Sequence, residues 1–143
     1  MAAPALLHAT KFNDQRGALC AFPGFDLSEV VRMYAIEPAN TRIIRAWQGH
    51  IKERKWFWVA AGSFEVQTIP LGADHIPQLN ARINWELSAS QPAVLAIPGG
   101  YLNGFKALEA DSKLMVFSDF DLEASKADDV RFTLEEIPWI DHG

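Results

Sequence analysis

Short apolar segments, each soon followed by Gly, Pro, Asn or Asp, run through most of this chain. The segments are shorter than ordinary globular helices, and the turn-forming residues between them break any helical period. This pattern is typical of strands joined by short turns, so we predict an all-β fold. The turn at residues 61–63 is predicted to join two strands as a hairpin. The predicted strands are residues 18–22, 30–37, 43–46, 56–61, 64–70, 82–88, 93–97, 104–109 and 113–118.

The length of the chain, 143 residues without a repeat or linker, predicts a single domain over 1–143 with one sizeable core. Many short strands in a domain of this size favour a jelly-roll barrel, in which two sheets fold together. Asp26 is positioned to cap a short helical turn. The polar segment 121–129 is expected to be a surface loop or one helical turn, and its carboxylates Asp128 and Asp129 are expected to be solvated.

Charge and cysteine content narrow the possible partners. The net charge is −5 and no Lys/Arg cluster is present, which argues against a nucleic-acid partner. A few inward-facing cations can still bind a phosphorylated small molecule. Cys20 is the only cysteine and lies in an apolar run, so we predict a buried, inert thiol. No apolar stretch approaches the ~20 residues of a membrane helix and the N-terminus lacks signal-peptide features, so we expect a cytoplasmic protein with no membrane partner.

One group of residues has a distinctive spacing: Gln48 and His50, then Lys55 and Gly62, and later the stretch 98–103, which ends at Asn103. This spacing resembles the two motifs of the cupin superfamily, whose fold is a jelly-roll barrel, also called a double-stranded β-helix. In that superfamily a His-x-His pair, a following Glu and a later His usually hold a metal ion. Here only His50 is a ligand-type residue, and an ammonium at Lys55 would repel a cation. The resemblance therefore implies a single cupin barrel with no metal and no other cofactor.

Alternation along strands predicts which of these side chains enter the barrel. Trp56 and Trp58 then face outward, where they cover either the second sheet or a subunit partner. The predicted pocket contains an imidazole, an ammonium and two amides, from His50, Lys55, Gln48 and Asn103.

Two of these residues have clear chemical roles available. His50 titrates near neutral pH and can take a proton from a carbon next to a ketone; the alternative is a structural histidine hydrogen-bonded in the barrel. Lys55 is costly to bury without an anion, so it either holds a diphosphate or an enolate oxygen, or extends to the rim or pairs with Glu53 or Glu65.

Four further residues are assigned by position. Arg45, at the end of its strand, suits bidentate phosphate recognition, whereas Arg42 is expected on the surface. Asn103 either hydrogen-bonds a ligand or holds the turn that precedes it. Tyr34 is amphipathic and belongs either to the pocket or to the core and rim.

The surrounding residues are similar to the dTDP-4-dehydrorhamnose 3,5-epimerase family, and more closely to its branch with the sugar 3,4-ketoisomerases and WxcM-like cupins. The resemblance runs from residue 30 to residue 120 and extends to DDVRF at 128–132. It implies a homodimeric, metal-independent cupin that acts on a nucleotide-sugar of the dTDP-4-keto-6-deoxyhexose type in deoxysugar biosynthesis. The resemblance rests on RMYAI at 32–36, IRAWQGH at 44–50, KWF at 55–57, GSFEV at 62–66, IPGGYLNGF at 97–105 and FSD at 117–119.

The chain departs from the epimerases at two positions. Their Arg-Gly-x-His motif supplies the base that abstracts a proton beside the ketone, and Gln48 stands at that histidine. Their proton-donating tyrosine lies on the strand that here reads LMVF at 114–117, with Val116 and no tyrosine.

The ketoisomerases carry Arg-Gly-x-His-x-His and move a proton between neighbouring carbons. Arg45, His50 and the upstream Tyr34 match that pattern, while Gln48 replaces the first histidine. Lys55 matches a family lysine that contacts substrate.

The leading hypothesis is a nucleotide-sugar isomerase or epimerase-like enzyme. His50 is its proton shuttle and Tyr34 its acid. A second hypothesis is a non-catalytic nucleotide-sugar-binding cupin that has lost the base and the acid. A third is a metal cupin with an irregular ligand set, such as a dioxygenase. In the leading hypothesis the substrate contacts are Arg45, Gln48, Lys55 and Asn103.

Overall fold

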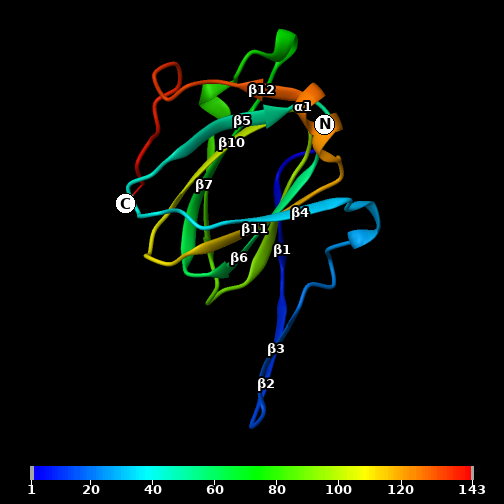
Figure 1. Ribbon diagram of the computed structural model, residues 1–143. Coiled ribbons are helices and arrows are strands. Elements are labelled where there is room, and N and C mark those ends of the chain that lie inside the picture. Colours follow the sequence, from blue (N-terminus) through cyan, green and yellow to red (C-terminus); the bar gives the residue numbers. More distant parts are fainter. Residues whose placement is uncertain (1, 143) are drawn as a thin grey trace.

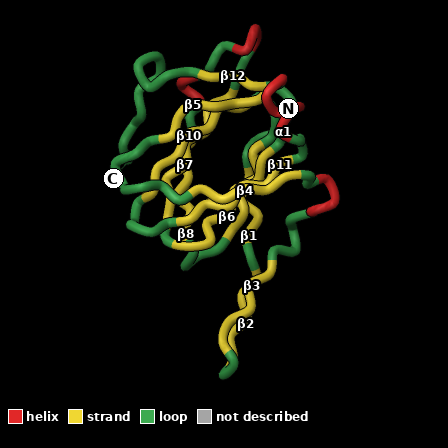
Figure 2. The backbone as a smooth tube through the Cα atoms, viewed as in Figure 1, coloured by secondary structure: helices red, strands yellow, loops and turns green. Residues whose placement is uncertain are grey.

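The computed structural model describes residues 2–142, which form two five-stranded sheets and a separate two-stranded hairpin (Figure 1). The first sheet has the strand order β1-β9-β6-β11-β4 and the second has β12-β5-β10-β7-β8. Figure 2 shows the two sheets curving around a common interior, which confirms the predicted all-β jelly roll. The strands are β1 (Ala5–His8), β2 (Thr10–Asp14), β3 (Gly17–Ala21), β4 (Arg32–Ile36), β5 (Arg45–His50), β6 (Lys55–Ala61), β7 (Ser63–Pro70), β8 (Ile83–Ser88), β9 (Ala93–Ile97), β10 (Tyr101–Ala107), β11 (Lys113–Ser118) and β12 (Asp129–Arg131).

The helical elements are short. The α-helix α1 (Leu122–Ala127) begins after Asp121, whose carboxylate accepts a hydrogen bond from the backbone N–H of Ala124 at 2.8 Å. One 3-10 turn, Leu27–Glu29, follows the predicted cap Asp26. The others are Ala73–His75 and Leu79–Ala81. No helix within residues 2–142 is long and apolar enough to cross a membrane.

Apolar alternation predicts most of the strands, and β9 and β11 have the predicted bounds. It does not indicate β1, β2 or β12. The last of these is polar and short, and it is a strand because it pairs antiparallel with β5, with Val130 opposite Gly49. Such a pairing depends on residues far away in the sequence.

The predicted hairpin at residues 61–63 is wrong. β6 lies between β9 and β11 in the first sheet, whereas β7 lies between β10 and β8 in the second. The turn therefore passes the chain from one sheet to the other. Gly62 permits this step, because its φ is +72° and a Cβ there would clash with the side chain of Ser112.

The main core fills the space between the sheets. Phe57 and Leu114 of the first sheet and Phe64 and Val66 of the second are almost completely buried there. Burying each side chain of this size stabilises the fold by about 1.5–3 kcal/mol. Phe105 joins the two layers, with its ring edge-on to Phe57 at 5.8 Å between centroids.

A second apolar cluster lies on the outer face of the second sheet, beneath the C-terminal segment, residues 133–142. Trp47 is buried, and its indole N–H donates to the carbonyl of Ile137 at 2.7 Å. Its ring stacks on Trp139 at 5.6 Å. The C-terminal segment is thus fixed to the strand that supplies much of the site described below.

Trp56 and Trp58 face outward, as alternation predicts. Residues of the same chain cover them: the ring of Phe25 lies 5.6 Å from Trp56, and Phe22 lies edge-on to Trp58 at 5.6 Å. The segment that leads from β3 to β4 therefore closes the outer face of the first sheet.

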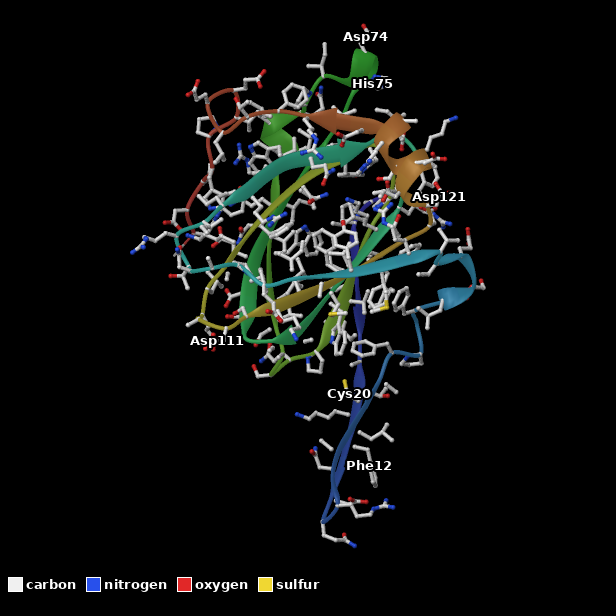
Figure 3. The ribbon with its side chains drawn as sticks, viewed as in Figure 1. Phe12, Cys20, Asp74, His75, Asp111 and Asp121 are labelled. Atoms are coloured by element: carbon white, nitrogen blue, oxygen red, sulfur yellow. The ribbon has the colours of Figure 1, made fainter. Side chains whose placement is uncertain are left out.

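The β2–β3 hairpin projects away from the barrel (Figure 1). Figure 3 shows Phe12 and Cys20 along it, and Cys20 is exposed, so the prediction of a buried thiol is wrong. The apolar run around Cys20 belongs to a projecting hairpin whose strand β3 is exposed over most of its length. Phe12 and Leu19 are each 63% exposed.

Candidate functional site

A cavity of about 530 Å³ opens between β4, the edge strand of the first sheet, and β5 and β12 of the second. Its wall includes aromatic and aliphatic residues such as Phe57, Phe105 and Val116. Side chains from both sheets meet here, because the period of two along each strand directs alternate residues inward. The lining includes five residues that the sequence singles out: Tyr34, Arg45, Gln48, Lys55 and Asn103.

A second cavity of about 400 Å³ adjoins the first. Tyr34, Gln48, Lys55 and Arg131 line both, so the two spaces form one continuous site. The second cavity extends the site toward α1 and the start of β4. Its own residues include Arg32, Ser125, Lys126 and Asp129.

Lys55 lies at the point where the two cavities meet. It is the first residue of β6 and is only 4% exposed. Among residues 2–142, no carboxylate lies within ion-pairing distance of its ammonium. Its two expected partners are engaged elsewhere: Glu53 contacts His50, and Glu65 contacts His142. A buried ammonium without a carboxylate partner is costly, and a bound anion offsets that cost.

The charges around Lys55 have mostly one sign. Arg45 and Arg131 also line the first cavity, and no Asp or Glu belongs to its described lining. Arg32 and Lys126 add positive charge to the second cavity, where Asp129 is the carboxylate. The site is therefore positive although the whole chain carries a charge of −5.

His50 is buried but lies outside the described lining of both cavities. Its Nε2 lies 3.2 Å from the hydroxyl of Ser125 and 3.2 Å from a carboxylate oxygen of Glu53. Ser125 itself lines the second cavity, so its hydroxyl stands between the imidazole and that space. Burial lowers the pKa of His50, and the nearby charge of Lys55 lowers it further, against the opposite effect of Glu53. The imidazole is therefore neutral at neutral pH.

One oxygen of Glu53, Oε2, has two partners. It accepts a hydrogen bond from Ser118 at 2.6 Å and lies 3.5 Å from the guanidinium of Arg32. Asp128 fixes the adjoining turn, because its carboxylate accepts backbone hydrogen bonds from residues 51–53 at 2.8–3.2 Å. The expectation of a solvated Asp128 is therefore wrong.

Asp129 is also structurally engaged. Its carboxylate accepts a hydrogen bond from the side-chain amide of Gln48 at 3.1 Å and another from the Nε of Arg131 at 2.6 Å. Burial raises the pKa of Asp129, but the hydrogen bonds from Arg131 and Gln48 outweigh burial and hold the pKa below its usual value. Asp129 is thus an ionised acceptor at the wall of the site.

Sequence reasoning missed the residues that α1 and β12 contribute to the site. Ser125, Lys126, Asp129 and Arg131 lie in a polar stretch whose pattern resembles a surface loop. The similarity of DDVRF at 128–132 to the family motif is the one signal that indicates Asp129 and Arg131, and it does not extend to Ser125 or Lys126. Arg42, by contrast, is exposed as expected.

The residues at the four cupin ligand positions do not fit a metal ion. Lys55 presents an ammonium to the cavity, and Gln48 and Asn103 present amides, which are weak ligands for a transition metal. His50 is absent from the lining of both cavities and contacts Glu53 and Ser125. Within residues 2–142, no group of three or more His, Cys, Asp or Glu side chains is arranged to hold a metal ion.

Comparison with known proteins supports the fold. No family model matches the sequence. No curated protein is detectably similar in sequence. Among solved structures, a sugar 3,4-ketoisomerase from Thermoanaerobacterium thermosaccharolyticum in complex with TDP superimposes with a TM-score of 0.72 at 18% identity, over 90% of this chain and 88% of that one.

Two epimerases are also similar in structure. The dTDP-4-dehydrorhamnose 3,5-epimerase from Bacillus anthracis, solved with TDP and PPi, gives a TM-score of 0.78 at 20% identity, over 98% of this chain and 86% of that one. A 3'-monoepimerase from Streptomyces bikiniensis, solved with dTDP, gives 0.80 at 11% identity, over 96% and 75%. These proteins are of the kinds that the sequence motifs resemble, and the likeness confirms the cupin jelly-roll fold.

Proposed function

We propose that this protein is a metal-independent, nucleotide-sugar isomerase or epimerase-like enzyme. It transfers a proton next to the ketone of a dTDP-4-keto-6-deoxyhexose-type substrate in deoxysugar biosynthesis. The observation that carries the proposal is the ammonium of Lys55, buried at the junction of two cavities with no carboxylate partner among residues 2–142. A diphosphate or a developing enolate oxygen satisfies such a group.

The size and charge of the site support this ligand class. A cavity of about 530 Å³ lies within the usual range for small-molecule sites, roughly 300–1,000 Å³. Arg45 can bind phosphate oxygens in a bidentate manner, and Arg131 faces the same space. Three solved structures of similar fold contain TDP or dTDP. The apolar wall, with Phe57 and Phe105, suits the base or the 6-deoxy carbon of the ligand.

The proposed chemistry begins at His50. As a neutral imidazole it can accept the proton of the carbon next to the ketone, and the hydroxyl of Ser125 links it to the second cavity. Tyr34, which lines both cavities, is the proposed acid. Lys55 stabilises the enolate oxygen that forms when the proton leaves. Gln48 and Asn103 hydrogen-bond sugar hydroxyls.

A second candidate function is a nucleotide-sugar-binding protein without catalysis. The position of His50, outside the lining of both cavities, favours it. So does Val116, which lines the first cavity and stands where the resemblance to the epimerases implies a proton-donating tyrosine. The two candidates share the ligand and differ in whether solvent protons exchange into it.

A thermal-shift screen with dTDP, UDP, GDP and their 4-keto sugars tests the ligand class. Because a ligand that binds only the folded state raises stability by RT ln(1 + [L]/Kd), modest affinity suffices for detection. We expect a shift with one nucleotide series, lost in Arg45→Ala and retained in the matched variant Arg42→Ala. Arg42 is exposed and lies outside the described cavities. No shift with any nucleotide would contradict the proposal.

We also propose that the protein is a cytoplasmic homodimer. The projecting β2–β3 hairpin supports a dimer, because Phe12 and Leu19 expose apolar surface that a second copy can cover. Light scattering on the wild type and on a Phe12→Asp, Leu19→Asp double variant tests it. A wild-type mass equal to that of one chain would contradict the dimer.

A further inference from the structure

Gln48 is the residue that replaces a histidine in the first cupin motif, and its amide is held by a carboxylate at the wall of the second cavity. The Nε2 of Gln48 donates to Oδ1 of Asp129 at 3.1 Å. The other oxygen of Asp129 accepts from Arg131 at 2.6 Å, and Asp129 and Arg131 both belong to β12, which pairs with β5. The carboxylate is therefore fixed by its own strand and by the neighbouring guanidinium.

This arrangement determines which end of the amide faces the ligand. An ionised carboxylate only accepts hydrogen bonds, so the NH₂ group of Gln48 must face Asp129. The amide is planar, and its carbonyl oxygen then points away from Asp129. Gln48 lines both cavities, and within residues 2–142 its side chain hydrogen-bonds through the NH₂ group, to Asp129. The site therefore has a fixed hydrogen-bond acceptor at this position, with an ammonium from Lys55 on the same lining.

We infer that Gln48, held by Asp129, selects ligands that donate a hydrogen bond at this point, so the bound sugar places a free hydroxyl on Gln48 and not its keto oxygen. The inference rests on the proposed function, since it concerns the sugar part of a nucleotide-sugar. A keto oxygen only accepts, so next to the Gln48 carbonyl it leaves two acceptors facing each other. Lys55 donates and cannot accept, so the ketone belongs on the lysine side. Asp129 is a positioning residue in this scheme, and Gln48 determines specificity.

The test measures the binding of dTDP-glucose and its singly deoxyfluorinated analogues by titration calorimetry. Each analogue replaces one sugar hydroxyl by fluorine, which is similar in size but cannot donate. For the wild type we expect one analogue to bind about ten-fold more weakly than dTDP-glucose, the effect of leaving one acceptor unpaired. The other analogues bind within a few-fold of the parent compound.

Two variants distinguish the effect of the orientation of the Gln48 amide from the effect of its contact with the ligand. In Asp129→Asn the amide of Gln48 is free to turn, because asparagine both donates and accepts, and the discrimination against that analogue falls to less than about three-fold. Gln48→Met removes the acceptor while keeping the length of the side chain, and it abolishes the same discrimination without altering the contact between Asp129 and Arg131. Because Asp129 also contacts Arg131, a change in affinity that is equal for all analogues is attributed to Arg131. Only a difference in affinity between analogues is attributed to Gln48.

The outcomes are distinct. Loss of the discrimination in both variants supports the inference. Equal binding of all analogues by the wild type overturns it while leaving nucleotide-sugar binding in place. Discrimination that persists in Gln48→Met also overturns it, since another residue then reads the hydroxyl. Failure of both dTDP and dTDP-glucose to bind the wild type removes the proposed function and the inference together. Gln48→Met remains a valid test if Asp129→Asn does not fold.

Discussion

His50 and Ser125 meet side chain to side chain, with the imidazole Nε2 3.2 Å from the serine hydroxyl. His50 ends β5 and Ser125 belongs to α1, so this contact joins the barrel to the helix beside it. Both the serine hydroxyl and a Glu53 oxygen approach the same ring nitrogen. This is not the geometry of a nucleophilic triad, in which the acid and the serine contact opposite nitrogens. The contact fits a proton route between imidazole and cavity.

This route predicts graded effects on turnover. His50→Ala should lower kcat by about 100-fold to 10,000-fold, the usual contribution of a general base. Ser125→Ala should lower kcat by roughly ten-fold with little effect on KM, because it removes one hydrogen bond from the route and no ligand charge. Steady-state kinetics on the 4-keto sugar, with Ser90→Ala as an exposed control, measures both. Unchanged turnover in His50→Ala would eliminate this residue as the base.

Replacing Lys55 is expected to have opposite effects on the stability of the free protein and on its affinity for dTDP. Lys55→Met keeps the length of the side chain and removes a buried charge that has no carboxylate partner within residues 2–142. The melting temperature of the free protein should therefore stay the same or rise. Affinity for dTDP should fall by about ten-fold or more, as expected when a charge-assisted hydrogen bond is lost.

Lys11→Met serves as the control, because Lys11 lies exposed on the projecting hairpin. A lower melting temperature with undiminished dTDP affinity would show that the ammonium of Lys55 is structural and not a ligand contact.

The lowered pKa of His50 predicts how stability depends on pH. In the unfolded chain His50 titrates near its ordinary value of 6.5, and in the fold it titrates below that value. Between the two values the unfolded state binds more protons, so stability rises with pH through this window and falls as the pH drops below 6.5. Melting curves across pH 5–8 (roughly the range in which histidine titrates) measure the effect.

His50→Gln supplies the comparison for the pH series. It lacks a titrating ring, so the slope below pH 6.5 should become shallower than in the wild type. Equal slopes in the two proteins would contradict a neutral, buried His50.

The turn between β6 and β7 is expected to require glycine at position 62. Gly62→Ala places a Cβ against Ser112 at a φ of +72°, so it should destabilise the fold by about 1–3 kcal/mol. Gly24→Ala is the matched control, since its added Cβ meets only ordinary contacts at 3.9 Å from Leu7. Chemical denaturation measures both variants. Equal stabilities would mean that the step between the sheets tolerates a side chain.

Much of the barrel is predictable from sequence because its strands bury one face. Alternation identifies β6, β7 and β11, whose inward residues Phe57, Val66 and Val116 are buried. It also places Lys55 and Asn103 in the cavity. These inferences need only the period of two along a strand. Which of the two sheets a strand joins depends on residues that are distant in the sequence. The tight turn at Gly62 therefore looks like a hairpin in the sequence, although it connects the two sheets.

The remainder of the site depends on pairings that no local pattern encodes. Asp129 and Arg131 line the cavity because β12 pairs with β5, where Arg131 lies opposite Gln48. Alternation puts His50 on the same side as Gln48, yet at the end of the strand Ser125 and Glu53 enclose its ring. Whether a side chain faces open space or a neighbour is decided by which residues pack over it.

The most direct test of the proposed function is solvent deuterium exchange. The protein is incubated with dTDP-4-keto-6-deoxyglucose in D₂O, and the proton signals beside the ketone are followed by NMR, with His50→Ala as control. The account predicts that the wild type replaces one of these protons by deuterium much faster than the control or buffer alone. Binding of the same compound without any exchange above buffer would contradict proton transfer and would identify the protein as a nucleotide-sugar binder.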